Sequence, residues 1–445
     1  MESLIPTFGG LIWTIAAFII ALSVIVAIHE YGHYIVGKWS GIKAEVFSIG
    51  FGPVLASRIG KDGTKWQIAA LPFGGYVKFL GDTSAASDKP DQEVLDEMSA
   101  EERRRTMHGA PLWARAATVV AGPLFNFILS FILFCGLVMY RGVMADPLTV
   151  EELRTLPNVV QELQEGDVIL EIDGRSVPMP DQFADFTDQL EPAPTLEYRI
   201  ERDGQEMTVT GPWLYPPLVS GTTPNSAAAD ADLQEGDVVL SANGTSIFDF
   251  DQLRDIVGDS EGNDIVLEVW REGEETLTKT LSPTRRDLPL ADGGFETRWL
   301  IGMNGGLLFQ PASQPPTFVE TISYGANQIV FIIKSSLSGL YHMVAGKIST
   351  CNLSGPIGIA ETSGQAASQG AVSFIWFIAL LSTAVGMLNL FPIPVLDGGH
   401  LVFHAYEWAT GRPPSDRALK IMMATGLSLM LMLMVFAVAT DLVCP

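Results

Sequence analysis

Four apolar stretches dominate this chain, and each is long enough to cross a lipid bilayer. They lie near residues 10–36, 115–140, 372–396 and 419–442. A transmembrane helix needs about 20 apolar residues to span the hydrocarbon core. A chain of 445 residues with 47% hydrophobic and only 18% charged residues is also too apolar for a soluble enzyme. We therefore expect a polytopic α-helical membrane protein with four transmembrane helices.

The first apolar stretch contains an HExxH pattern, His29-Glu30-Tyr31-Gly32-His33. In a helix, His29 and His33 are one turn apart on the same face, so both imidazoles can bind one zinc ion. Glu30 lies beside them and can accept a proton from metal-bound water. Ionisable side chains in a bilayer are costly unless they are paired or bound to metal. We therefore interpret the pattern as a zinc site rather than a chance pentapeptide.

A hydrolytic zinc site needs a third protein ligand and an open position for water. The candidate is Asp397, which follows the third apolar stretch in the run Asn389–Gly399. Pro392 and Pro394 in this run break the helix, which would leave backbone carbonyls and the Asn389 amide free to meet a substrate.

Two further histidines are rivals for the metal. His400 and His404 are also one turn apart and follow Asp397 closely, so they could form a second site or replace Asp397 as ligands. A carboxylate with two histidines is a familiar hydrolase set, so we expect zinc on His29, His33 and Asp397.

The net charge of -24 is distributed unevenly. Residues 142–316 hold 33 aspartates and glutamates against 10 lysines and arginines, whereas basic residues are frequent between the first two apolar stretches. Further basic residues lie between the last two. By the positive-inside rule these two loops are cytoplasmic, and both termini and the acidic middle face the periplasm of a Gram-negative cell. A basic footprint for nucleic acid is absent, so we expect no nucleic-acid partner.

The acidic middle contains an internal repeat. Residues 163–170, Leu-Gln-Glu-Gly-Asp-Val-Ile-Leu, recur 70 residues later as Leu-Gln-Glu-Gly-Asp-Val-Val-Leu at 233–240. Each copy continues into an Asp-Gly or Asn-Gly turn, at 173–174 and 243–244, and then a helix-like segment. Such turns between strands are typical of hairpins. We therefore expect two tandem β-rich (α+β) modules with one helix each.

These modules resemble PDZ domains of the circularly permuted bacterial kind, on the run Asn225–Ala229 followed by Leu233–Val238. PDZ domains bind extended peptides by adding a strand to a sheet edge, so peptides are possible ligands. The alternative is a pair of spacer domains without a ligand.

We expect domains at 1–145 (membrane), 146–215 (first PDZ), 216–290 (second PDZ), 291–370 (connector with an amphipathic membrane-surface helix at 317–346) and 371–445 (membrane).

The order of motifs along nearly the whole chain resembles the site-2 protease family of intramembrane zinc metalloproteases. The matching motifs are HExxH, Pro72–Lys78, Gly122–Asn126, the tandem modules and Asn389–Gly399. The resemblance implies zinc on His29, His33 and Asp397, with Glu30 as general base and later proton donor. It implies substrate contacts from Asn389 in the proline-containing run, and from a membrane-associated β-loop that pairs with the substrate. The β-loop residues are Gly74, Gly75, Tyr76 and Val77.

Gly122, Pro123 and Asn126 match the family's motif in the second span. We interpret them as close helix packing plus one interhelical hydrogen bond.

The resemblance also implies a place and a substrate class. A multi-pass enzyme of the bacterial inner membrane would hold its active site near the cytoplasmic side and its PDZ modules in the periplasm. It would cut single-pass membrane proteins that another protease has shortened, such as an anti-sigma factor in an envelope stress response, or remnant signal peptides. The alternative is a non-proteolytic, membrane-anchored PDZ receptor or scaffold.

The three cysteines, Cys135, Cys351 and Cys444, are far apart and form no CxxC pair. Their spacing suggests no disulfide framework, so we expect them to serve in packing.

Overall fold

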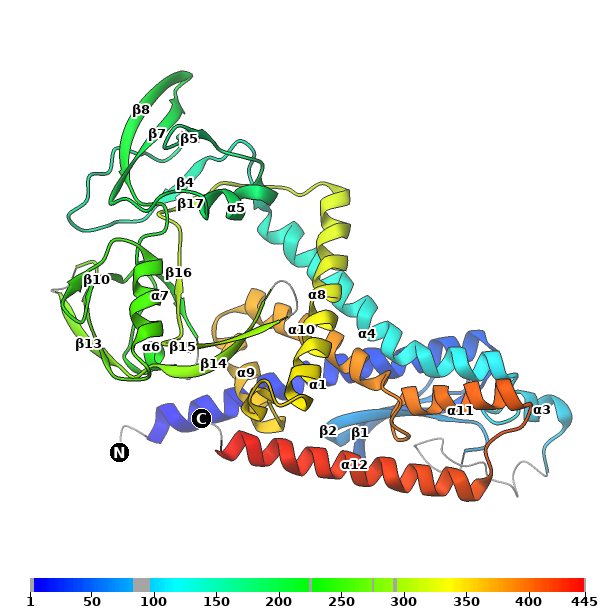
Figure 1. The fold of residues 1–445 in the computed structure, drawn as a ribbon. Coiled ribbons are helices and arrows are strands. Elements are labelled where there is room, and N and C mark those ends of the chain that lie inside the picture. The colour runs from blue at the N-terminus through cyan, green and yellow to red at the C-terminus, as the bar shows by residue number, and fades with distance from the viewer. Residues whose placement is uncertain (1–3, 83–96, 224–225, 274–275, 291–293, 444–445) are drawn as a thin grey trace. The chain divides into compact units, whose positions relative to one another are not determined.

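The computed structural model describes residues 4–82, 97–223, 226–273, 276–290 and 294–443. The chain divides into two compact units, which are described separately (Figure 1). Unit 1 comprises Met1–Leu137, Val319–Val344 and Ser349–Pro445. Unit 2 comprises Val138–Phe318 and Ala345–Ile348.

Unit 1 is helical apart from one β-hairpin. Its elements are α1 (Leu4–Trp39), β1 (Ala44–Ile59), β2 (Lys65–Phe79), α3 (Ala100–Arg104), α4 (Leu112–Arg141), α8 (Phe318–Val344), the short 3-10 helix η2 (Thr350–Asn352), α9 (Pro356–Ser368), α10 (Ala371–Asn389), α11 (Asp397–Thr410) and α12 (Asp416–Val443).

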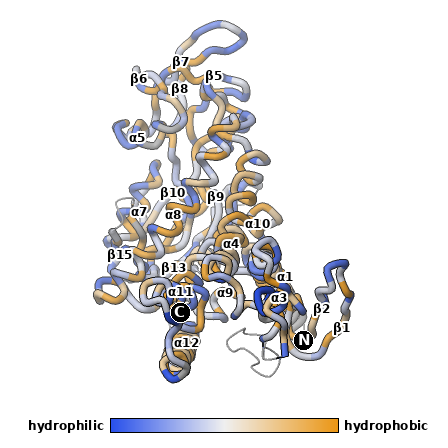
Figure 2. Tube along the Cα trace, turned by 90° about the vertical axis from the view of Figure 1, so that its right-hand side faces the viewer, coloured by the Kyte–Doolittle hydropathy of each residue, from blue (hydrophilic) through white to orange (hydrophobic). Residues whose placement is uncertain are grey.

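Among the described residues, 4 helices are long and apolar enough to cross a membrane. They are Gly10–Trp39, Leu112–Arg141, Ala371–Asn389 and Arg417–Val443, which confirms the predicted set of spans. Figure 2 shows the hydrophobic colouring that runs along α4 and α10. The third helix ends at Asn389 rather than at 396, because Pro392 and Pro394 follow it and cannot donate the hydrogen bonds that continue a helix.

Residues 318–344, within the predicted amphipathic segment, form helix α8, which packs along α4. The close approach depends on Gly325, where an added Cβ would lie 2.7 Å from the Cys135 sulfur. Ile332 of α8 is buried in one cluster with Phe134 and Leu137 of α4. The location of α8 at a membrane surface stays a prediction.

The β1–β2 hairpin is curled, so that residues 44–49 pair on both sides. They pair with residues 75–79 on one side and with residues 65–68 on the other. Residues 75–79 have no strand partner beyond β1 among the described residues and therefore form a sheet edge. This edge lies beside α1, where a Cβ added to Gly75 would be 3.0 Å from Val26 and 3.1 Å from Glu30.

The turn of the hairpin is tied to the end of α1. Asp62 accepts hydrogen bonds from the Tyr34 hydroxyl at 2.5 Å and from Lys38 Nζ at 2.8 Å. Aromatic packing of Tyr34 against Trp66, with ring centroids 5.0 Å apart, reinforces the contact. The hairpin is therefore held on α1 at the helix turn that follows the two histidines.

Unit 2 consists mainly of short strands. Its elements are β3 (Val143–Met144), β4 (Val150–Leu153), β5 (Val168–Ile172), β6 (Arg175–Ser176), η1 (Pro180–Gln182), α5 (Phe183–Thr187), β7 (Thr195–Arg202), β8 (Gln205–Pro212), β9 (Val219–Thr222), α6 (Ala227–Asp230), β10 (Val238–Ala242), β11 (Thr245–Ser246), α7 (Phe250–Asp259), β12 (Ile265–Trp270), β13 (Leu277–Leu281), β14 (Thr284–Pro289), β15 (Phe295–Leu300), β16 (Met303–Gly305), β17 (Phe309–Pro311) and β18 (Ser313–Gln314).

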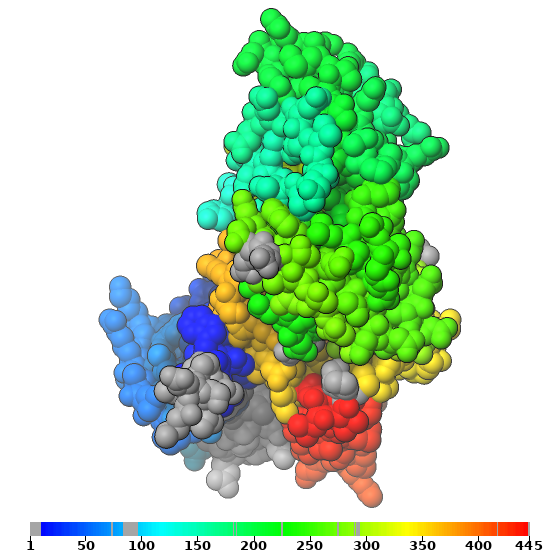
Figure 3. Space-filling model, turned by 90° about the vertical axis from the view of Figure 1, so that its left-hand side faces the viewer, coloured from blue at the N-terminus to red at the C-terminus, as the bar shows by residue number. Residues whose placement is uncertain are grey.

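The internal repeat folds as two sheets of the same design. Their strand orders are β6-β5-β7-β8 and β11-β10-β12-β13, and each sheet covers its own hydrophobic core. The predicted hairpin turns are confirmed, because Asp173 and Asn243 both have positive φ, at 50°. Side chains of this part of the chain form the cyan to green surface in Figure 3.

Each repeat also buries one ion pair at the same place. Asp167 accepts from Arg202 through both carboxylate oxygens at 2.7 Å, and Asp237 accepts from Arg271 at 2.7 and 2.9 Å. Both aspartates are almost fully buried and also accept the backbone N–H three residues upstream. The aspartate of the repeated Gly-Asp-Val therefore supplies one partner of a buried ion pair in each module. Removing either partner would leave the other charge buried and uncompensated.

Residues 295–314, placed by the sequence in a connector, form strands that pair with both modules. β16 pairs with β9 of the second module, β17 pairs with β4 of the first, and β18 pairs with β3. Leu308 and Phe309 are fully buried in the core of the first module. These strands have two or three residues each, too few for an alternating pattern to identify them in the sequence.

The end of α12 is tied to the start of α9. Asp441 accepts hydrogen bonds from the backbone N–H of Gly355 at 2.7 Å and of Ile357 at 3.0 Å, so it caps α9.

The cysteines differ in their state. Cys351 in η2 is disulfide-bonded, whereas Cys135 is free. The expectation of a packing role was therefore wrong for Cys351, because sequence spacing does not show which distant cysteines the fold brings together.

Candidate metal centre

The two histidines of the HExxH pattern project from α1 toward α4. The helices approach closely at two glycines: a Cβ on Gly32 would lie 2.4 Å from the carbonyl oxygen of Ala121, and a Cβ on Gly122 would lie 2.3 Å from His33 Nε2. The missing side chain at Gly122 therefore leaves the space that the imidazoles occupy. This confirms close packing as one role of the Gly122 motif.

Asp397 is the first residue of α11, directly after the proline-containing loop. The next two residues must be glycine, because a Cβ on Gly398 would lie 2.2 Å from the Phe391 carbonyl and one on Gly399 would lie 2.3 Å from the Ile393 carbonyl. The loop thus folds back onto the first turn of the helix. A helix N-terminus also favours a negative side chain.

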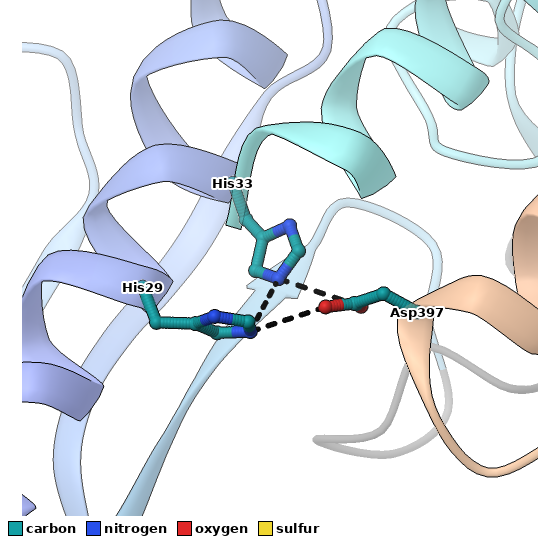
Figure 4. Close-up of side chains that lie close together, drawn as sticks. All are labelled: His29, His33 and Asp397. Atoms are coloured by element: carbon teal, nitrogen blue, oxygen red, sulfur yellow. Dashed lines mark hydrogen bonds and ion pairs between the residues drawn. The ribbon is translucent and has the colours of Figure 1, made fainter. Parts of the chain in front are cut away.

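His29, His33 and Asp397 converge, as Figure 4 shows. Their nearest ligand atoms all lie within 4.8 Å of one another, and the described residues contain no other such group of three or more His, Cys, Asp and Glu side chains. The two Nε2 atoms are 3.2 Å apart. His29 Nε2 lies 3.2 Å from Asp397 Oδ2, and His33 Nε2 lies 3.6 Å from Asp397 Oδ1.

The His29–His33 separation and the nearest contact of each histidine to Asp397, 3.2–3.6 Å, are close to the spacing in a tetrahedral zinc site, with the two Asp397 contacts made by different carboxylate oxygens. Ligand bonds of about 2.0–2.2 Å separate neighbouring ligand atoms by roughly 3.3–3.6 Å in such a site. Asp397 Oδ2 is also buried without a well-formed hydrogen bond to any described residue. The three side chains are only 12–18% exposed. A divalent cation would satisfy all three groups, and one tetrahedral position would stay open.

Helix α4 faces the second ring nitrogen of each histidine. His33 Nδ1 lies 2.8 Å from the Thr118 carbonyl oxygen, and His29 Nδ1 lies 3.2 Å from the Asn126 side-chain nitrogen. A carbonyl can only accept, so Nδ1 of His33 carries the proton and Nε2 is free to bind metal. Sequence reasoning missed Thr118, because a backbone carbonyl carries no side-chain signal. For Asn126 the sequence analysis predicted one interhelical hydrogen bond, on the basis of the motif Gly122–Asn126.

A cavity of about 540 Å³ opens onto this group. Glu30, Asn389 and the β2 edge residues Gly75, Tyr76 and Val77 line it. Gly74, Pro392 and Pro394 do not. Pro392 is exposed, and Pro394 packs against Gly426 of α12.

Glu30 connects α1 to the edge strand of the hairpin. The backbone N–H of Val77 faces its carboxylate and interacts with it favourably. A Cβ on Gly75 would lie 3.1 Å from Glu30 Cγ, so this glycine permits the contact. Glu30 is thereby held beside the histidines without joining the ligand group.

The rival histidines line the same cavity but do not join the ligand group. Burial and the neighbouring Arg115 guanidinium lower the pKa of His404 to about 4, so its imidazole is neutral at neutral pH. A neutral imidazole can bind metal. His404 is therefore outside the ligand group because of its position and not because of its protonation state.

An ion pair that the sequence did not indicate joins α4 to α11. Arg115 Nη2 lies 2.7 Å from Glu407 Oε1, and Nη1 lies 3.0 Å from Oε2. Such a bidentate pair fixes geometry well. It braces the helix that begins with Asp397.

Replacing Gly122 by alanine should damage the cluster. The new Cβ would lie within 2.9 Å of both imidazole rings, so either a ring or a helix must move. We expect zinc affinity, measured by chelator competition, to fall by more than about tenfold, as for other changes around metal ligands. Gly136→Ala is the matched control on α4, because nothing lies within 4 Å of its Cβ. It should retain zinc affinity and gain about 0.5–1 kcal/mol of stability. Equal zinc affinity in both variants would contradict the packing argument.

The sequence model of peptidase family M50 matches residues 17–433. Among curated proteins, Atu1380 of Agrobacterium fabrum, named as a zinc metalloprotease, is 35% identical and covers 99% of both chains. R01501 of Rhizobium meliloti, also named as a zinc metalloprotease, is 35% identical over 97% of this chain and 96% of its own length. The Regulator of sigma-E protease RseP of Salmonella typhimurium is 31% identical over 97% of this chain and 99% of its own.

Proposed function

Because the chain belongs to peptidase family M50 and is a zinc metalloprotease, we propose that it hydrolyses peptide bonds inside the transmembrane segments of other proteins. The family membership and the four apolar helices identify a multi-pass membrane protease. The observation that carries the proposal is the converging group His29, His33 and Asp397, which lies between apolar helices and opens onto a cavity. A scaffold without catalysis would have no use for this group beside Glu30.

We assign zinc to His29 Nε2, His33 Nε2 and one carboxylate oxygen of Asp397. A zinc ion held there supplies Lewis acidity toward the scissile carbonyl. Glu30 accepts a proton from the attacking water and passes it to the leaving amine. The Val77 N–H faces the Glu30 carboxylate and favours its position beside the histidines.

The substrate must offer an extended backbone to this site. A transmembrane helix hides its peptide bonds in its own hydrogen bonds, so a protease has to unwind it and replace those bonds. We assign that role to the edge at Gly74–Val77, to which an unwound segment can add as a strand. Asn389, at the end of α10 and in the cavity wall, contacts the substrate backbone. Pro392 and Pro394 shape the loop that follows it.

The two repeat modules act as PDZ domains on the periplasmic side of the inner membrane, and the active site lies near the cytoplasmic side. Support comes from the acidic charge of residues 142–316 and the basic loops on the opposite side of the spans. In this arrangement the modules exclude bulky substrates, with or without binding a peptide.

The substrates are single-pass membrane proteins after a first cleavage by another protease. Relatives whose names contain regulator of sigma E support an anti-sigma factor as one substrate. Remnant signal peptides share the same short, single-span character and form a second class.

The proposal is tested with the purified full-length chain and a tagged transmembrane segment in detergent. One substrate lacks any extramembrane domain and a second carries a folded domain on its periplasmic end. We expect cleavage of the short substrate only, loss of cleavage with a zinc chelator, and recovery when zinc is returned.

Two outcomes would contradict parts of the proposal. Equal cleavage of both substrates would exclude a size filter in the modules. Cleavage of soluble peptides but of no transmembrane segment would exclude an intramembrane protease.

A further inference from the structure

We infer that Asn126 of α4 orients His29 by accepting a hydrogen bond from its Nδ1–H through the side-chain oxygen. The inference rests on the proposed assignment of zinc to the Nε2 atoms. Because an imidazole that binds metal through Nε2 carries its proton on Nδ1, His29 then needs an acceptor at that position. Metal-bound histidines generally have such a partner.

Two observations locate this acceptor in Asn126. Its amide lies 3.2 Å from His29 Nδ1, and the side chain is fully buried between helices. The atom nearest the ring is the amide nitrogen, which can only donate, while Asn126 Oδ1 is buried and lacks a hydrogen-bond partner among the described residues. The two ends of an amide are nearly isosteric, so their assignment follows from the hydrogen-bond network. Exchanging them places Oδ1 3.2 Å from His29 Nδ1, where it can accept the hydrogen bond of the ring N–H.

The backbone around Asn126 is well anchored. Its carbonyl oxygen accepts from the Ser130 hydroxyl at 3.0 Å and from the Ser382 hydroxyl of α10 at 2.9 Å. Ser382 therefore bonds the backbone of Asn126 rather than its side-chain amide. Together with the contact of His33 to the Thr118 carbonyl, this arrangement makes α4 the helix that sets the orientation of both rings.

The arrangement predicts a hierarchy of substitutions. Asn126→Leu keeps the volume but removes the acceptor, so zinc affinity should fall about 10–100-fold. Asn126→Asp keeps an oxygen toward His29 and should preserve the affinity. Ser382→Ala removes a hydrogen bond to the same residue's backbone and should leave the zinc affinity unchanged.

The experiment is chelator competition on the purified full-length chain in detergent, with zinc alone as the probe and the unfolding temperature of each zinc-free variant as the folding control. Asn126→Ala serves if the leucine variant does not fold. Wild-type zinc affinity in a folded leucine or alanine variant would overturn the inference and leave Asn126 with a packing role. An aspartate variant as weak as the leucine variant would exclude the oxygen as acceptor. His29→Ala is the reference: if it retains the zinc affinity, the ligand assignment itself fails.

Discussion

Replacement of Glu30 by glutamine should abolish cleavage while leaving zinc in place. Glutamine has the same size and keeps a carbonyl oxygen that can face the Val77 N–H, so the contact with the hairpin edge should survive. It cannot take a proton from the attacking water. General acid–base catalysis contributes about 10²–10⁴-fold to rate, so we expect a loss of that order in cleavage of the transmembrane segment. Zinc content should stay at the wild-type level, because Glu30 is outside the converging group.

The control is Glu45→Gln, which removes an acid from the same unit at a side chain that is 37% exposed and paired with Lys78. It should cleave like the wild type. If Glu30→Gln kept most of its activity with zinc bound, Glu30 would not be the base. Glu407, which lines the same cavity, would then be the next candidate.

The membrane helices could be predicted because hydropathy is a property of local sequence. Each span carries its own run of apolar residues, and the HExxH pair needs only the 3.6-residue repeat of a helix to bring His29 and His33 onto one face. The repeat was visible for the same reason, since the sheet register and the Asp-Gly and Asn-Gly turns are encoded within each copy.

The surroundings of the histidines could not be predicted in this way. The contacts of Thr118 and Asn126 depend on how α4 crosses α1, which is set by the fit of Gly32 and Gly122 against the opposite helix. The sequence does not show whether a glycine in an apolar stretch faces open space or another side chain. At Gly122 an added Cβ would lie 2.3 Å from a ring nitrogen. Only the packed structure separates these cases.

The strands after the second module were missed for another reason. β16 and β17 are short, and they complete sheets whose other strands lie far away in the chain, as β17 does with β4. Their stability comes from the partner edge and from burial of Leu308 and Phe309, rather than from an alternating pattern of their own. A one-dimensional pattern therefore assigned this segment to a connector.

Replacement of Asp397 by asparagine should remove the zinc ion. The amide is nearly isosteric with the carboxylate, so the loop and the start of α11 should keep their positions, but the negative charge that completes the ligand set is lost. Changes outside the ligand shell already cost about 10–100-fold in metal affinity, so loss of a ligand charge should cost at least about 100-fold. Cleavage should disappear at zinc concentrations that saturate the wild type.

Thermal unfolding in the presence of zinc measures this directly, because a ligand that binds only the folded state stabilises it. At a concentration 100 times the wild-type dissociation constant, zinc adds about 2.7 kcal/mol to the wild type but only about 0.4 kcal/mol to a variant that binds 100-fold more weakly. His404→Gln is the matched control, since His404 lies on the same helix and lines the same cavity without joining the cluster. It should keep the full zinc stabilisation. The opposite result, with zinc lost in His404→Gln and retained in Asp397→Asn, would move the third ligand from Asp397 to His404.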